Sequence, residues 1–292
     1  MDGDELTHTT KYVESEITRR LTAIEEHLDC DVITCFLPIS PPFDDLIRDA
    51  LEDIDGRRGK LLVILETYGG HIETAERVAN VLRHHYPEEV NFVVPNHAMS
   101  AGTILVMSGD NIYMDYYSIL GPIDPQLKHK NGNMVPALGY LDKYGEMIER
   151  SRRKELSAAE IAILVQKFDP AEIHRYEQAR DHSIDLLKKW LAVYKFKNWK
   201  TTSSGRTVTK RMRESRAAQI AKALNDTKRW RSHARGLSMD VVRTDLNLVI
   251  ANLADDPELN KRVRSYYRLL QDHMSGKGHT MALHTRNGLL VT

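Results

Sequence analysis

Hydrophobic residues in the first half of the chain follow two patterns, short continuous apolar runs and helical spacings. The runs at 31–38, 60–67, 90–95 and 111–116 are rich in β-branched and aromatic residues, which indicates strands. The second run is apolar almost throughout, as expected for a strand covered on both faces of a parallel sheet. Between the runs, for example across 72–86, apolar residues recur every three or four positions and predict helices. This alternation predicts an α/β fold with a parallel sheet and right-handed crossovers.

The segments on either side of this core have a different pattern. Apolar residues at helical spacing predict an N-terminal helix that begins at Thr9 or Thr10. From Leu138 to Leu224 the chain is charged and helical in period, and the polar stretch 200–209 is expected to be an exposed loop. The Gly-, His- and Thr-rich end is expected to be poorly ordered. We therefore divide the chain into an N-terminal helix (1–30), an α/β core (31–150), a helical extension with the remainder of the core (151–255) and a tail (256–292).

Composition narrows the possible cellular compartments and binding partners. The 292 residues include 41 Lys plus Arg and 41 Asp plus Glu, so the net charge is zero and favours no particular partner. The acidic N-terminus lacks the apolar segment of a secretory signal, and no apolar run approaches the ~20 residues that span a bilayer. Cys30 and Cys35 are expected to be buried free thiols. These features favour a soluble cytoplasmic protein.

A pair of glycines follows the second predicted strand. Gly69 and Gly70 allow positive φ angles and a close approach of the backbone to a ligand, with N–H groups pointing outward. A plain tight turn would have the same sequence, so this feature gains weight only in combination with another.

A serine among small residues follows the third predicted strand. Ser100 lies at a loop-to-helix junction, where small neighbours admit a substrate and the start of the helix offers N–H groups to a developing oxyanion. A helix-capping serine is the simpler interpretation. Because the two loops lie at the same ends of successive strands, Gly69 or Gly70 on one side and the amide of Ala101 on the other can form a two-donor oxyanion hole around Ser100.

Three sequence blocks occur in order: YGGHIETAERVANVLR, NHAMSAGTILVMSGDNIYMD and SILGPIDPQ. In these blocks the chain resembles the Clp protease and signal-peptide-peptidase clan, closest to the serine dehydrogenase proteinases. The resemblance covers roughly residues 20–145, with a fainter echo at 230–248. It implies the spiral α/β fold shared with crotonases, Ser100 as nucleophile, an oxyanion hole at Gly69, Gly70 and Ala101, and a homo-oligomer.

The general base is left open between two residues. Where Clp proteases carry their histidine, this chain has LGPIDP, which contains none, and His129 follows in a predicted exposed loop. The signal-peptide-peptidase branch uses a lysine at the start of a later helix, which corresponds to Lys143. A lysine base requires burial to lower its pKa, whereas a solvated helix lysine is the simpler interpretation. His97 is expected to shape the loop.

A basic stretch between Leu186 and Arg235 holds fifteen lysines and arginines against two acidic residues. Its interleaved aromatic residues are Trp190, Tyr194, Phe196, Trp199 and Trp230. Such a pattern can bind single-stranded nucleic acid, but a solvated helical face is favoured, so nucleic acid is not an expected partner. The surplus of apolar residues between Leu138 and Leu224 favours a subunit interface over an additional layer on the same subunit.

These observations predict a serine peptidase that cleaves peptides or proteins through a Ser100 acyl-enzyme, with no metal or organic cofactor. Two alternatives stay open. A crotonase-type acyl-CoA enzyme builds a similar oxyanion hole but needs no serine, and a catalytically inactive scaffold or basic binding module would keep only the fold.

Overall fold

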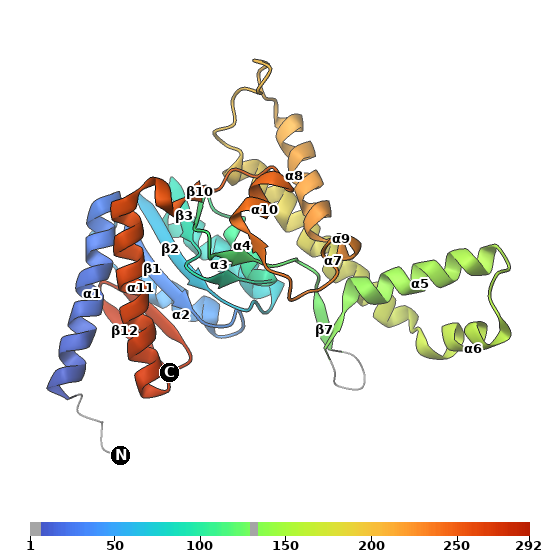
Figure 1. The fold of residues 1–292 in the computed structure, drawn as a ribbon, viewed down its shortest axis with the longest axis horizontal. Coiled ribbons are helices and arrows are strands. Elements are labelled where there is room, and N and C mark those ends of the chain that lie inside the picture. Colours follow the sequence, from blue (N-terminus) through green and yellow to red (C-terminus); the bar gives the residue numbers. More distant parts are fainter. Residues whose placement is uncertain (1–6, 129–133) are drawn as a thin grey trace.

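The structure is a computed structural model that describes residues 7–128 and 134–292 (Figure 1). Its helices are α1 (His8–Leu28), α2 (Phe43–Glu52), α3 (Ile72–His85), α4 (Ala101–Val106), α5 (Ala137–Arg152), α6 (Ala158–Lys167), α7 (Pro170–Trp190), the π-helix η1 (Leu191–Lys195), α8 (Lys210–Leu224), α9 (Thr227–Trp230), α10 (Met239–Thr244), the 3-10 helix η2 (Leu253–Asp255) and α11 (Pro257–Lys277). Its strands are β1 (Asp31–Phe36), β2 (Lys60–Glu66), β3 (Glu89–Val93), β4 (His97–Ala98), β5 (Asn111–Met114), β6 (Ile119–Leu120), β7 (Gln126–Lys128), β8 (Met134–Pro136), β9 (Leu237–Ser238), β10 (Ala251–Asn252), β11 (Ala282–Thr285) and β12 (Gly288–Val291).

A seven-stranded sheet forms the centre, in the order β10-β5-β3-β2-β1-β11-β12. The strands from β10 to β1 run parallel, and the last two are antiparallel additions. A second sheet, β4-β6-β9, lies beyond the ends of these strands, and β7 pairs with β8. The predicted α/β class with a mostly parallel sheet is confirmed.

Both faces of the sheet are covered, which explains the continuous apolar run in β2. Leu62 and Ile64 pack with α1 and α11, which lie side by side in Figure 1. Leu61, Val63 and Leu65 belong to the larger core with α2, α3 and α4. The alternation of β-strand side chains therefore sends successive apolar residues into two different cores.

The C-terminal residues differ from the prediction, because they form part of the central sheet. β11 pairs with β1 along one edge and with β12 along the other. Beneath them the hydroxyl of Tyr266 donates to Thr34 Oγ1 at 2.7 Å and lies 2.9 Å from Nδ1 of the buried His284. Burial lowers the pKa of His284 to about 4. Polar residues that suggested disorder in the sequence are thus paired inside the fold.

The helical extension divides into a packed part and a projecting part. Leu186, Leu187 and Trp190 of α7 are buried in the larger core, so this portion of the apolar surplus is a layer on the same subunit. Helices α5 and α6 project away from the body in Figure 1. α6 has no buried residue, and Ile161 and Val165 are 47% and 75% exposed. Exposed apolar residues of the predicted surplus therefore lie mainly on α6, with Val193 of η1 as a further exposed residue outside the projecting part.

Two other predictions concern individual features. Cys30 and Cys35 are free and buried, as predicted. Within residues 7–128 and 134–292, no helix is both long enough and apolar enough to cross a membrane.

Candidate active site

Ser100 stands at the junction between β4 and α4 with a strained backbone. Its φ and ψ are 52° and −117°, a region that residues with a side chain rarely adopt, and its hydroxyl does not cap the helix. The N–H of Gly102 donates to the carbonyl of Met99 at 2.8 Å, and that of Ile104 to the carbonyl of Ser100 at 3.2 Å. These two hydrogen bonds hold the sharp turn at Ser100 before and after the serine. Strained backbone of this kind is common at functional sites.

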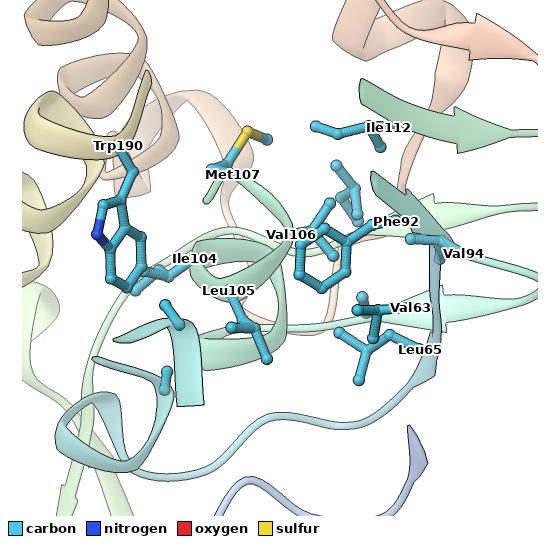
Figure 2. Close-up of a cluster of buried hydrophobic side chains, with 14 of the residues drawn as sticks. Val63, Leu65, Phe92, Val94, Ile104, Leu105, Val106, Met107, Ile112 and Trp190 are labelled. Atoms are coloured by element: carbon cyan, nitrogen blue, oxygen red, sulfur yellow. The ribbon is translucent and has the colours of Figure 1, made fainter. Parts of the chain in front are cut away.

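The short helix after Ser100 is anchored by burial. All six residues of α4 are buried. Figure 2 shows Leu105 and Val106 among side chains of the sheet, including Phe92, while Ile104 lies beside Trp190 of α7. This packing fixes the start of α4, and with it the position of Ser100, between the sheet and the extension.

Gly69 lies against the serine loop, and Gly70 lies against the backbone of Ile39. Gly69 has φ of 101°, and a Cβ at this position would lie 2.7 Å from the carbonyl oxygen of Met99 and 2.9 Å from Cβ of Ser100. Gly70 has φ of 153°, and its Cβ would lie 2.1 Å from the carbonyl oxygen of Ile39. Both positions therefore require glycine, for conformation and for space.

The amides of the expected oxyanion hole are not equivalent. The N–H of Gly69 donates to Oγ1 of Thr67 at 3.0 Å, so it is already occupied, and Gly70 is left as the possible donor of the glycine pair. The N–H groups of Gly70 and Ala101 donate to no other residue of the described chain. The N–H of Ala101 is unpaired because this residue lies in the first turn of α4, where no helical carbonyl precedes it. Two free donors remain beside Ser100.

Ser100 opens into a cavity of about 670 Å³. Its lining combines the two loops with residues distant in sequence: Tyr68, Gly69, Gly70, His71, Ile72, Glu73, Ser100, Ala101, Ile104, Ile123, Pro125, Arg175, Ala179, Ser183 and His233. The extension therefore supplies one wall through α7. The cavity is large enough for a side chain and flanking backbone of a peptide.

His233 lies in this cavity although the sequence analysis did not single it out. It follows α9, and it also lines a second cavity of about 190 Å³ that contains Asp124. Its Nδ1 is buried without a hydrogen-bond partner, and burial lowers the pKa of its imidazole. One signal was available, because His233 is the only histidine in the basic stretch 186–235.

Asp124 comes from the block GPIDPQ, where the expected histidine is missing. Its side chain is buried, and Oδ1 accepts the N–H of Leu138 at 3.1 Å. Burial raises the pKa of this carboxyl group to about 6, and the charge of Asp142 acts in the same direction. Asp124 is therefore a carboxylate near neutral pH, in the same cavity as His233.

The residues predicted as bases are placed elsewhere or not described. Lys143 is 59% exposed, its Nζ lies 3.0 Å from Oε2 of Glu146, and it lines neither cavity. The structure thus contradicts the burial that a lysine base requires. His129 lies outside the described residues. The ring centroids of His97 and Tyr68 are 4.2 Å apart, and His97 does not line the Ser100 cavity.

Comparison with known proteins identifies the family. Residues 56–206 match the family described as ClpP-like SDH-type serine proteinase. This chain belongs to that family. The match includes both loops of the site, Asp124 and all of α7, and it ends before His233.

Two curated proteins of Methanocaldococcus jannaschii are similar over shorter stretches. The uncharacterized protein MJ0137 is 43% identical over 65 residues, which is 22% of each chain. The uncharacterized protein MJ1495 is 29% identical over 100 residues, or 34% of this chain and 32% of that protein. The matched stretches thus span about a fifth to a third of these relatives.

Solved structures also resemble the chain at low sequence identity. One is a mutant of the 1510-N membrane-bound stomatin-specific protease in complex with a substrate peptide, with a TM-score of 0.46, 15% identity and 80% coverage of each chain. Another is ClpP1 from Listeria monocytogenes, with a TM-score of 0.42, 10% identity and coverage of 79% of this chain and 95% of that one.

Proposed function

We propose that this chain is a serine peptidase in which Ser100 is the nucleophile and His233 the general base. The observation that carries the proposal is the single cavity that brings together Ser100, two free amides and a histidine from outside the core loops. Nucleophile, base and oxyanion donors are the groups that acyl transfer requires.

Each group has a defined role in the proposed reaction. Neutral His233 takes the hydroxyl proton as Ser100 attacks the peptide carbonyl carbon. The N–H groups of Gly70 and Ala101 stabilise the resulting oxyanion. Protonated His233 then gives its proton to the leaving amine, and the acyl-enzyme forms. Water, activated by His233, releases the second product and restores the serine.

Asp124 supplies the negative charge that favours the protonated imidazole. Since the pKa of this carboxyl group is about 6, it is ionised at pH 7 and above and loses its charge below pH 6. Protonation of both His233 and Asp124 therefore opposes activity in acid. With a histidine base, activity rises through the pKa of His233, which burial holds below its ordinary value, and is flat above neutral pH.

A fluorophosphonate probe tests the proposal, because it labels only an activated serine. We expect labelling of the unmodified protein, none of Ser100→Ala, and labelling of His233→Ala slowed by roughly 10²–10⁴. His174→Ala, an exposed histidine on α7, is the matched control and should label normally. Equal labelling of His233→Ala and the control would reject the histidine base. Absence of labelling in the unmodified protein would favour the inactive scaffold or the acyl-CoA enzyme.

We also propose that the protein forms a homo-oligomer. The support is α6, whose apolar side chains are exposed at the end of the projecting part. Light scattering on the purified protein tests this: a particle larger than one chain is expected, and Ile161→Glu together with Val165→Glu should dissociate it. A stable monomer that is active when dilute would refute it.

A further inference from the structure

One buried side chain, that of Thr67, contacts both loops of the proposed site. Thr67 follows β2 directly and is 3% exposed. Its Oγ1 accepts the N–H of Gly69 at 3.0 Å. Its methyl group lies against the start of α4, because a Cβ at Gly102 would lie 2.5 Å from Cγ2 of Thr67. The hydroxyl of Thr67 therefore holds the glycine loop, while its methyl group packs against the serine loop.

The direction of the Gly70 N–H is fixed by the peptide group that Gly70 shares with Gly69. The carbonyl oxygen of Gly69 accepts the N–H of Ile39 at 2.9 Å. This peptide is trans, so its C=O and N–H groups point in opposite directions. The N–H of Gly70 thus points away from Ile39, and Gly70 lines the Ser100 cavity. The bond to the Gly69 carbonyl is what leaves this N–H available to an oxyanion.

Gly69 can keep this orientation only if it is held, because glycine rotates more freely than any other residue. Its φ is 101°, its carbonyl is bound by Ile39 and its N–H by Thr67. The bond from Thr67 is the one of these two that comes from a side chain, so substitution can remove it without touching the backbone.

We propose that Thr67 is a positioning residue whose Oγ1 fixes Gly69 and thereby keeps the N–H of Gly70 directed at the oxyanion. The methyl group of Thr67 contributes packing. This inference rests on the proposed role of Ser100 and does not depend on that of His233.

Two substitutions separate the hydroxyl from the methyl group. Thr67→Val keeps a methyl group against Gly102 but leaves the buried N–H of Gly69 without an acceptor. We expect fluorophosphonate labelling of Ser100 at pH 8 to slow about tenfold, part of the roughly 10²–10³-fold that loss of a whole oxyanion donor costs. Thr67→Ser keeps the acceptor and removes the methyl group. It should label within about threefold of the unmodified protein, although it melts at a lower temperature.

Thr34→Val is the matched control for stability. Thr34 is buried on the neighbouring strand β1, and its Oγ1 accepts the hydroxyl of Tyr266 at 2.7 Å. The control variant also loses a buried acceptor, but on the side of the sheet covered by α11 and not at the loops. It should therefore melt at a lower temperature and label normally, when all variants are measured at a temperature at which they are folded.

Slow labelling of Thr67→Val, with Thr67→Ser and Thr34→Val close to the unmodified protein, supports the inference. Equal slowing of Thr67→Ser would mean that packing and not the hydrogen bond matters, and equal slowing of Thr34→Val would mean a general loss of stability. Either result overturns the inference, as does normal labelling of Thr67→Val. If Thr67→Val fails to fold, Thr67→Ala takes its place in the comparison with Thr67→Ser.

The two proposals fail in different ways. If the unmodified protein labels and Ser100→Ala does not, the proposed nucleophile stands, and normal labelling of Thr67→Val then refutes only the role of Thr67. If the unmodified protein does not label, or if Ser100→Ala labels like it, both proposals fall together.

Discussion

The two sides of the Ser100 cavity, the proposed nucleophile side and the proposed base side, are held together to very different degrees. On the nucleophile side, the N–H of Thr67 donates to the carbonyl of His97 at 3.1 Å and that of Met99 to the carbonyl of Thr67 at 2.9 Å, so the two loops fix each other. On the base side, no hydrogen bond joins the side chains of Asp124, Asn225 and His233, which line the cavity of about 190 Å³ and are all described.

This difference indicates which half of the site is complete before substrate binds. Ser100 and the proposed oxyanion donors are held in place by backbone hydrogen bonds and by the burial of α4. The base side has buried polar atoms still to be paired, and hydrogen bonds in unliganded active sites commonly tighten only in the substrate complex. Substitutions should therefore damage the first side by strain and the second by loss of proton transfer.

The largest effect is expected from Gly70→Ala on the nucleophile side. The new Cβ would lie 2.1 Å from a backbone oxygen at a φ of 153°, so the loop must move and carry its N–H away from the oxyanion. We expect labelling of Ser100 to fall by roughly 10²-fold or more, with a lower melting temperature. Gly56→Ala is the control, because its Cβ meets nothing within 4 Å, and it should label normally. Normal labelling of Gly70→Ala would remove this amide from the mechanism.

On the base side, Asp124→Asn should slow labelling by about tenfold while keeping the bond to Leu138. Loss of the negative charge disfavours the imidazolium, so the pKa of His233 falls and the acid limb moves to lower pH.

The same variant should melt at a higher temperature at pH 8. The pKa of Asp124 is raised to about 6 in the fold, so its stabilising contribution is present at low pH and is lost as pH rises through 6. The side chain of Asp124→Asn carries no charge at any pH, so the variant does not lose this stability at pH 8. An acid limb that moves upward, or lower stability at pH 8, would contradict the assigned role of the charge.

A smaller effect is expected from Trp230→Phe, which loosens only the support of the base side. It removes the hydrogen bond to the carbonyl of Ala223 but keeps most of the buried ring. We expect labelling to slow about threefold and the free energy of unfolding to fall by about 1 kcal/mol. Trp199→Phe, whose ring packs edge-on against Phe196, should alter neither labelling nor its pH dependence. Equal labelling in both variants would mean that His233 does not depend on this support.

The smallest effect is expected from Lys143→Ala, with labelling changed less than twofold. The lysine is exposed and paired with Glu146, and exposed pairs contribute about 0–1 kcal/mol to stability. Kinetic labelling at pH 8 measures this directly. A loss comparable to that of Ser100→Ala would restore the lysine base and remove His233 from the mechanism.

Local sequence was sufficient for the nucleophile side of the site. Strand β2 has a continuous apolar run because both faces of the sheet are covered. The loops that follow β2 and β3 carry glycines and small residues whose conformations depend on near neighbours. The sequence alone therefore predicted the parallel α/β core and the proximity of Gly70, Ser100 and Ala101.

The base side was decided only by tertiary structure. His233 lies 133 positions after Ser100, in a charged segment without a motif, and it reaches the cavity because α8 docks beside Asp124 through the bond from Ile123 to Leu224. Lys143 matched a sequence position but lies on an exposed helix surface. Backbone conformation and strand burial are encoded locally, whereas the burial and pairing of a titratable side chain depend on which distant segments pack around it.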